Sequence, residues 1–121
     1  MKLIFVYNAN SGPIDKLIDG AHKIVSPKTY DCHLCAITFG AFTEDDLWKS
    51  YREHSPNELH FYHKDEFEKE FRSKWLPKYD YPVILTEAEN NLEVFLPKSE
   101  LTTIENSEAL IEAINERAAH Y

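Results

Sequence analysis

The sequence predicts an α/β domain in which a central mixed four-stranded sheet is flanked by helices. Short apolar runs alternate along the chain with stretches whose apolar residues recur at helical spacing, which is the pattern of strands and helices packed in layers. The chain has 121 residues, 43% of them hydrophobic, and this is enough to build one core. We therefore expect a single domain over residues 1–121.

The first strand and the segment after it are marked by a change of residue type. Aromatic and branched residues predict a strand over residues 2–7, and turn-forming residues follow at 8–12. Pro13 suits the first position of a helix, and apolar residues then recur at helical spacing as far as Val25. We expect a helix over about residues 13–25.

Both cysteines of the chain lie in the motif Cys-His-Leu-Cys at residues 32–35. Asp31 is a good helix N-cap residue, and Gly40 is a good helix terminator. These signals predict a short helix that carries both sulfur atoms on one face.

The next helix has the clearest start signal in the sequence. Thr43 and Asp46 have the spacing of a capping box, and Phe42 and Leu47 have the spacing of a hydrophobic staple. We expect a helix that begins at Thr43. Three of its side chains should face inward: Leu47, Trp48 and Tyr51.

A second strand and helix follow directly. The apolar and aromatic run predicts a strand over residues 58–63. Asp65 and Glu68 again have capping-box spacing, and they precede Phe67 and Phe71, which lie one helical turn apart. This pattern predicts a strand followed at once by a helix.

The last part of the chain predicts a β-hairpin and a closing helix. Strand-like runs at 82–86 and 92–96 are separated by a polar loop at 87–91, so they should pair antiparallel. The long connection between the first two strands instead suits parallel neighbours with a right-handed crossover. A helix should begin at about Ser107 and bury three side chains: Leu110, Ile111 and Ile114.

This order of elements resembles the thioredoxin-like fold, over about residues 1–118. In that fold the proline before the third strand is commonly cis and lies beside the redox cysteines, and Pro82 stands at this position. The resemblance therefore implies a cis peptide bond between Tyr81 and Pro82. In typical members the Cys-x-x-Cys motif follows the first strand immediately. Here about two dozen residues intervene, so the expected fold carries a helical insertion after the first strand.

The opening segment, KLIFVYNANSG at residues 2–12, is also similar to the start of small uncharacterised bacterial proteins, some of which are labelled GTPases. A phosphate-binding P-loop needs Gly-x-x-x-x-Gly-Lys followed by Ser or Thr. None of the three glycines of this chain is followed by lysine. The residues therefore do not support a nucleotide site.

A Cys-x-x-Cys pair suggests thiol–disulfide chemistry. A thiolate in the first turn of a helix has a lowered pKa, so Cys32 would attack a disulfide and Cys35 would resolve the mixed product. The negative charge of Asp31 opposes this effect on the thiolate, whereas a protonated His33 would favour it. The thioredoxin-like resemblance adds Pro82, which would shape the substrate groove. The sequence thus suggests a thiol-disulfide oxidoreductase or a redox-responsive protein.

The alternative is a non-catalytic binding module whose Cys-x-x-Cys segment binds a metal or is purely structural. Tetrahedral zinc needs four ligands, and the nearest candidates are Cys32, Cys35, His22 and His33. Two chains could also pair their motifs to supply four thiolates. Reduced, inert thiols are the third interpretation, because cysteine is among the most buried residue types. We expect no cofactor other than this zinc ion.

The net charge and the hydropathy of the chain limit the classes of partner that it could bind. With 13 basic and 21 acidic residues, the formal net charge is −8, which disfavours nucleic acid and anionic membrane surfaces. No apolar stretch approaches the ~20 residues that span a bilayer, and the first apolar run is too short for a signal peptide. We expect a cytoplasmic protein whose partner is a protein thiol or disulfide.

Overall fold

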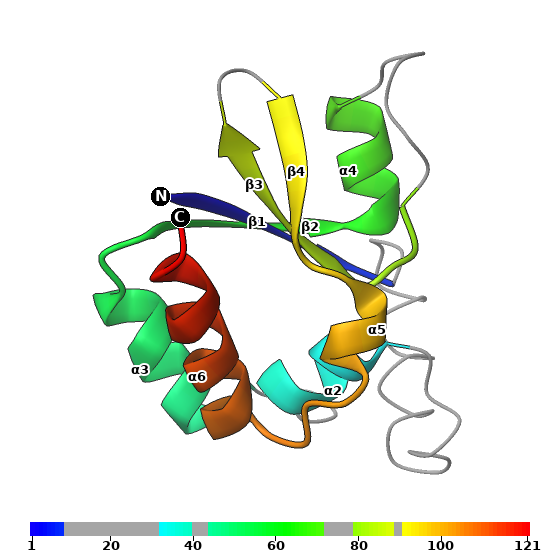
Figure 1. Cartoon of the computed structure of the whole chain (residues 1–121). Helices are drawn as coiled ribbons and strands as arrows, with labels where there is room; N and C mark the ends of the chain where they lie inside the picture. The colour runs from blue at the N-terminus through cyan, green and yellow to red at the C-terminus, as the bar shows by residue number, and fades with distance from the viewer. Residues whose placement is uncertain (9–31, 40–43, 72–78, 89–90) are drawn as a thin grey trace, which may run out of the picture.

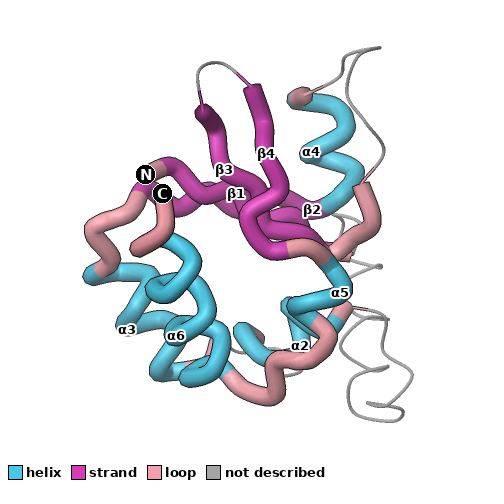
Figure 2. Tube along the Cα trace, in the orientation of Figure 1, coloured by secondary structure: helices cyan, strands magenta, loops and turns pink. Residues whose placement is uncertain are grey.

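The computed structural model describes residues 1–8, 32–39, 44–71, 79–88 and 91–121 (Figure 1). Within these ranges the chain forms a mixed four-stranded sheet with helices against both of its faces (Figures 1 and 2). The predicted α/β class with a central mixed sheet is confirmed. The helix predicted over residues 13–25 lies outside the described residues.

The sheet has the strand order β2-β1-β3-β4. β1 (Lys2–Tyr7) pairs parallel with β2 (Glu58–His63) and antiparallel with β3 (Val83–Ala88). β3 then pairs antiparallel with β4 (Asn91–Leu96). All four predicted strands are confirmed, but the ladder of the hairpin extends to residues 88 and 91 and so includes much of the predicted loop.

Helices connect and cover these strands. The described parts of the chain contain α2 (His33–Thr38), α3 (Asp46–His54), α4 (Lys64–Glu70), α5 (Lys98–Leu101) and α6 (Ser107–Ala118). The short helix α5 has no counterpart in the sequence prediction. Among these described helices, none combines the length and the apolar character that crossing a membrane requires.

Alternation along β1 creates two cores, one on each face of the sheet. Leu3, Phe5 and Tyr7 belong to the core beneath α2, α3, α5 and α6, whereas Ile4 and Val6 belong to the core beneath α4. Successive strand residues point to opposite faces, so a strand that is apolar throughout must be covered on both sides. The first core also contains Leu34, Trp48, Phe95, Leu101, Leu110 and Ile114.

The start of α3 corrects the sequence prediction. The helix begins at Asp46, and its N-cap is Asp45, whose carboxylate accepts a hydrogen bond from the Trp48 N–H at 3.0 Å. The prediction that it begins at Thr43 is wrong, although Phe42 and Thr43 themselves lie outside the described residues. The physical reason is that residue 44 forms a β-bridge to the segment after α2, which keeps the backbone extended up to the cap.

The inward face of α3 is centred on Trp48. Trp48 is fully buried and Tyr51 is partly buried, as predicted, whereas Leu47 is 48% exposed, so its predicted inward position is wrong. Adjacent helical residues are separated by about 100° around the axis. Burying the Trp48 side chain therefore turns the Leu47 side chain toward solvent.

The cap of α4 is also different from the prediction. His63, the last residue of β2, is the N-cap, and its N–H donates to the Glu66 carboxylate at 3.0 Å. The predicted box of Asp65 and Glu68 is wrong, because β2 runs straight into the helix and its last residue already supplies the cap. The buried position of Phe67 is confirmed.

The closing helix matches its prediction closely. α6 begins at Ser107, and the side chain of Asn106 accepts a hydrogen bond from a backbone N–H of the first turn at 2.8 Å. Leu110 and Ile114 are fully buried, and Ile111 is partly buried. Residues at this spacing share one helical face, so α6 presents an apolar stripe to the first core.

We expect Trp48→Ala to lower the free energy of unfolding by about 3–5 kcal/mol, because it opens a cavity in the core. The Trp48 ring packs against Phe5 and Tyr51, with both centroid distances at 5.5 Å. Leu47→Ala is the matched control in the same helix and should change stability by no more than about 0.5 kcal/mol. Urea unfolding measures both variants, and equal losses would contradict the burial of Trp48 and the exposure of Leu47.

Candidate functional site

The candidate site is built around a disulfide between Cys32 and Cys35, whose Cα atoms lie 5.2 Å apart. The two cysteines lie together on one short helical segment, as predicted. Cys32 is the N-cap of α2, and its sulfur accepts a hydrogen bond from the Cys35 N–H at 3.3 Å. Asp31 is therefore not the cap, because the sulfur already supplies the acceptor. Asp31 and Gly40 lie outside the described residues, and Phe39 caps the other end of α2.

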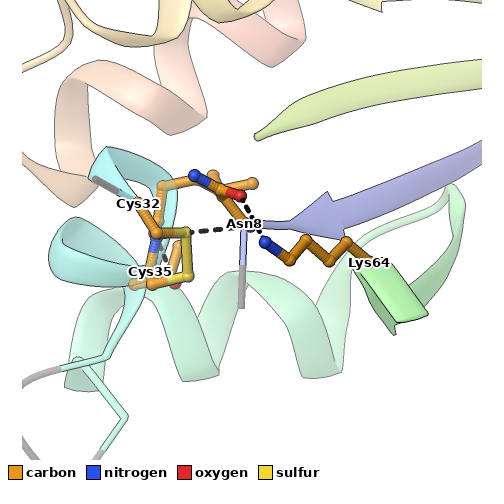
Figure 3. Close-up of a disulfide and its surroundings, with 6 residues drawn as sticks. Asn8, Cys32, Cys35 and Lys64 are labelled. Carbon is orange, nitrogen blue, oxygen red and sulfur yellow. Dashed lines mark hydrogen bonds between the residues drawn. A yellow bond between two sulfur atoms is a disulfide. The ribbon is translucent and has the colours of Figure 1, made fainter. Parts of the chain in front are cut away.

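The disulfide lies at the carboxyl end of β1. The backbone N–H of Asn8, the residue after β1, donates to Sγ of Cys32 at 3.3 Å, although the two residues are 24 positions apart (Figure 3). The long segment that separates β1 from the motif in sequence therefore does not separate them in space. The Cys-x-x-Cys motif meets the end of the strand directly.

Lys64 joins the same site from α4. Its Nζ lies 3.4 Å from Oδ1 of Asn8, on the side of Asn8 away from the disulfide (Figure 3). The parallel register pairs Tyr7 with His63, the last residues of β1 and β2. Asn8 and Lys64, which follow them, therefore leave the sheet at the same edge. Neither Asn8 nor Lys64 was predicted from the sequence as a site residue. The available signal was that each directly follows one of two parallel strands, whose carboxyl ends meet at one edge.

Pro82 occupies the same end of the sheet. The Tyr81–Pro82 peptide bond is cis, as predicted. Val6 pairs with Val83 in the antiparallel β1–β3 ladder, so Pro82 lies just beyond the ladder at the end of β1 that meets the disulfide. All three predicted site residues therefore belong to one end of the sheet, and two of them are bonded to each other.

Both sulfur-bearing residues are buried. Cys32 is 1% exposed and Cys35 is 6% exposed, and both belong to the core that contains Leu34 and Trp48. Thiol–disulfide exchange needs the attacking thiolate to approach one of the sulfur atoms. An outside thiol must therefore be small, or the segment that carries α2 must open to admit it.

The tyrosines near this end of the sheet are uncharged. Burial raises the pKa of the Tyr7 phenol to about 12. Loss of water around Tyr81 raises its pKa to about 12 as well, and the negative charge of Glu68 adds to this effect. Both hydroxyls stay protonated at neutral pH, whereas the Lys64 ammonium places positive charge beside Asn8.

The metal-binding alternative finds no assembled ligand set in the part of the chain that the structure describes. No group of three or more His, Cys, Asp or Glu residues that could hold a metal occurs there. His22 lies outside the described residues, as does the side chain of His33, which begins α2. The sulfurs of Cys32 and Cys35 are bonded to each other, and zinc binds cysteine as the thiolate.

We expect reduction of the disulfide to lower the free energy of unfolding by about 2 kcal/mol, because a short closed loop restricts the unfolded chain. Urea unfolding with and without dithiothreitol measures the difference. The double variant Cys32→Ser, Cys35→Ser is the control and should not respond to the reductant. Identical wild-type curves, together with two thiols that titrate as free without reductant, would contradict the disulfide.

Comparison with known proteins adds no relative: no family model matches the chain, and neither does any curated protein or solved structure.

Proposed function

We propose that this chain is a thiol–disulfide redox protein on a thioredoxin-like scaffold, in which Cys32 and Cys35 alternate between a disulfide and a dithiol. The observation that carries the proposal is the disulfide at the end of β1. There the N–H groups of Asn8 and Cys35 both donate to Sγ of Cys32, each at 3.3 Å.

The arrangement of the strands supports the scaffold part of the proposal. A central strand pairs with a parallel neighbour on one side and with an antiparallel hairpin on the other, in the order β2-β1-β3-β4. The cysteine motif lies at the carboxyl end of β1. Pro82, which precedes β3, lies at this same end of the sheet. These are the relations that the thioredoxin-like fold implies for its redox cysteines and its proline.

The hydrogen bonds of Sγ of Cys32 support different roles for the two cysteines. In the reduced protein, a thiolate on Cys32 keeps two N–H donors, and hydrogen bonds to a charged acceptor are stronger than those to a neutral one. The Cys32 thiolate attacks a disulfide RS–SR′, forms Cys32–S–S–R and releases R′S⁻. The Cys35 thiolate then attacks Sγ of Cys32, releases RS⁻ and restores the internal disulfide. The substrate gains two electrons, and two molecules of a low-molecular-weight thiol return them to the protein as they form their own disulfide.

The low exposure of Cys32 and Cys35 limits which disulfide substrates can reach their sulfur atoms. A small disulfide, or a protein disulfide on an extended segment, reaches a buried sulfur more easily than a folded surface does. This favours a redox-responsive protein, whose disulfide follows the thiol balance around it, over a general protein oxidoreductase. Catalytic cysteines are usually partly exposed.

The same burial favours a second candidate, a non-catalytic binding module in which the cysteine segment only stabilises the fold. Both cysteines contribute to the core together with Trp48, as a structural pair would. The two functions differ in one property: the redox protein cycles in the folded state, whereas the structural pair keeps one oxidation state until the protein unfolds.

We expect the wild-type protein to exchange electrons with oxidised glutathione, and Cys32→Ser to fall to the background rate because the attacking thiol is lost. Cys35→Ser should instead accumulate a mixed disulfide on Cys32, since the resolving thiol is missing. Thiol titration and intact-protein mass measure both results.

The redox proposal would be refuted if the wild type and both single variants reacted with oxidised glutathione at the same background rate. The same conclusion would follow if two thiols stayed free in an oxidising glutathione buffer. Either result would leave the binding module as the better account.

A further inference from the structure

We infer that Lys64 and Asn8 are positioning residues for Cys32, and that together they favour the reduced state of the cysteine pair. In this arrangement Lys64 holds the side chain of Asn8, and the backbone N–H of Asn8 is thereby kept against Sγ of Cys32. The inference rests on the proposed redox function and adds to it the residues that adjust its equilibrium.

The contacts form a continuous path from a positive charge to the sulfur. Nζ of Lys64 donates to Oδ1 of Asn8 at 3.4 Å, and the N–H of Asn8 donates to Sγ of Cys32 at 3.3 Å. Figure 3 shows Asn8 between the disulfide and Lys64, with one contact on each side. One asparagine thus links the redox pair to a lysine on another element.

The sheet and α4 fix both ends of this path. Tyr7, which precedes Asn8, is buried and pairs with His63, which precedes Lys64. His63 is in turn held by Glu66, whose carboxylate accepts from its N–H at 3.0 Å and lies 2.7 Å from its ring Nδ1. Because the residues before Asn8 and Lys64 are anchored, the two side chains meet with little loss of conformational freedom.

The hydrogen bonds from Lys64 to Asn8 and from Asn8 to Cys32 stabilise the dithiol and the disulfide states to different extents. A disulfide sulfur is neutral, whereas a Cys32 thiolate carries negative charge and is stabilised more by the N–H donor of Asn8, which Lys64 holds in place. Reduction of Cys32–Cys35 by two molecules of a low-molecular-weight thiol breaks the S–S bond and forms one external disulfide. Contacts that stabilise the thiolate therefore shift this equilibrium toward the reduced protein.

The experiment compares equilibrium constants for reduction in glutathione buffers. Lys64→Met should lower the equilibrium constant for reduction about threefold, the size expected when a partly exposed charged side chain loses its contact. Lys64→Arg keeps the charge and the donors and should restore most of the wild-type value. Lys69→Met is the matched control, because it removes the same charge from an exposed position on the same helix. It should behave as the wild type.

The role of Asn8 is tested by a double-mutant cycle. If Lys64 acts through Asn8, then adding Lys64→Met to Asn8→Ala should change the equilibrium constant little further. The inference would be overturned if Lys64→Met lowered the equilibrium constant threefold in the Asn8→Ala background as well. It would also be overturned if the Lys64→Met variant matched Lys69→Met.

Failure of this inference is separable from failure of the proposed function. A wild-type protein that does not cycle between disulfide and dithiol refutes the redox function itself. A wild-type protein that cycles normally, with Lys64→Met equal to the Lys69→Met control, refutes only the positioning role of Lys64.

Discussion

Burial of β1 (Lys2–Tyr7) on both faces and along both edges fixes the position of the candidate site. The strand has hydrogen-bonded neighbours on both edges and a packed core on both faces, so neither its register nor its ends can shift without exposing apolar side chains. Its carboxyl end therefore presents Asn8 at a fixed place. The Cys32–Cys35 disulfide and Lys64 both meet the chain there, which makes the end of this strand the reference point of the site.

The strands were predictable because burial leaves a local pattern in the sequence, as the uninterrupted apolar run of residues 2–7 shows. The helix starts were less predictable, because a cap depends on where the preceding backbone becomes free to turn. Thr43 has a good local signal, yet a β-bridge at residue 44 delays the helix until Asp45 can cap it. At α4, the strand itself supplies the cap through His63. In both cases the helix begins where the preceding extended backbone ends, and the spacing of cap residues alone does not give that point.

The candidate site, like the fold, was predictable only where its residues form a local pattern. Cys32 and Cys35 form a local motif, and their spacing alone places the two sulfurs on one helical face. Two other residues of the site come from distant sequence: Asn8, which donates to Cys32, is 24 residues away from it, and Lys64, which donates to Asn8, is 56 residues away from Asn8. The parallel pairing of β1 and β2, which the sequence predicted, brings Asn8 and Lys64 to one edge of the sheet. The contacts of these two side chains depend on the packing beyond the strand ends, which leaves no local pattern in the sequence.

The disulfide lies against the backbone N–H of Asn8, and amide NMR detects this contact in solution. Reducing the Cys32–Cys35 bond changes the acceptor of that hydrogen bond, so the Asn8 amide should be among the resonances that shift most. The amide of Lys2, at the opposite end of the same strand, should stay in place. An Asn8 amide that shifts no more than that of Lys2 would contradict the account.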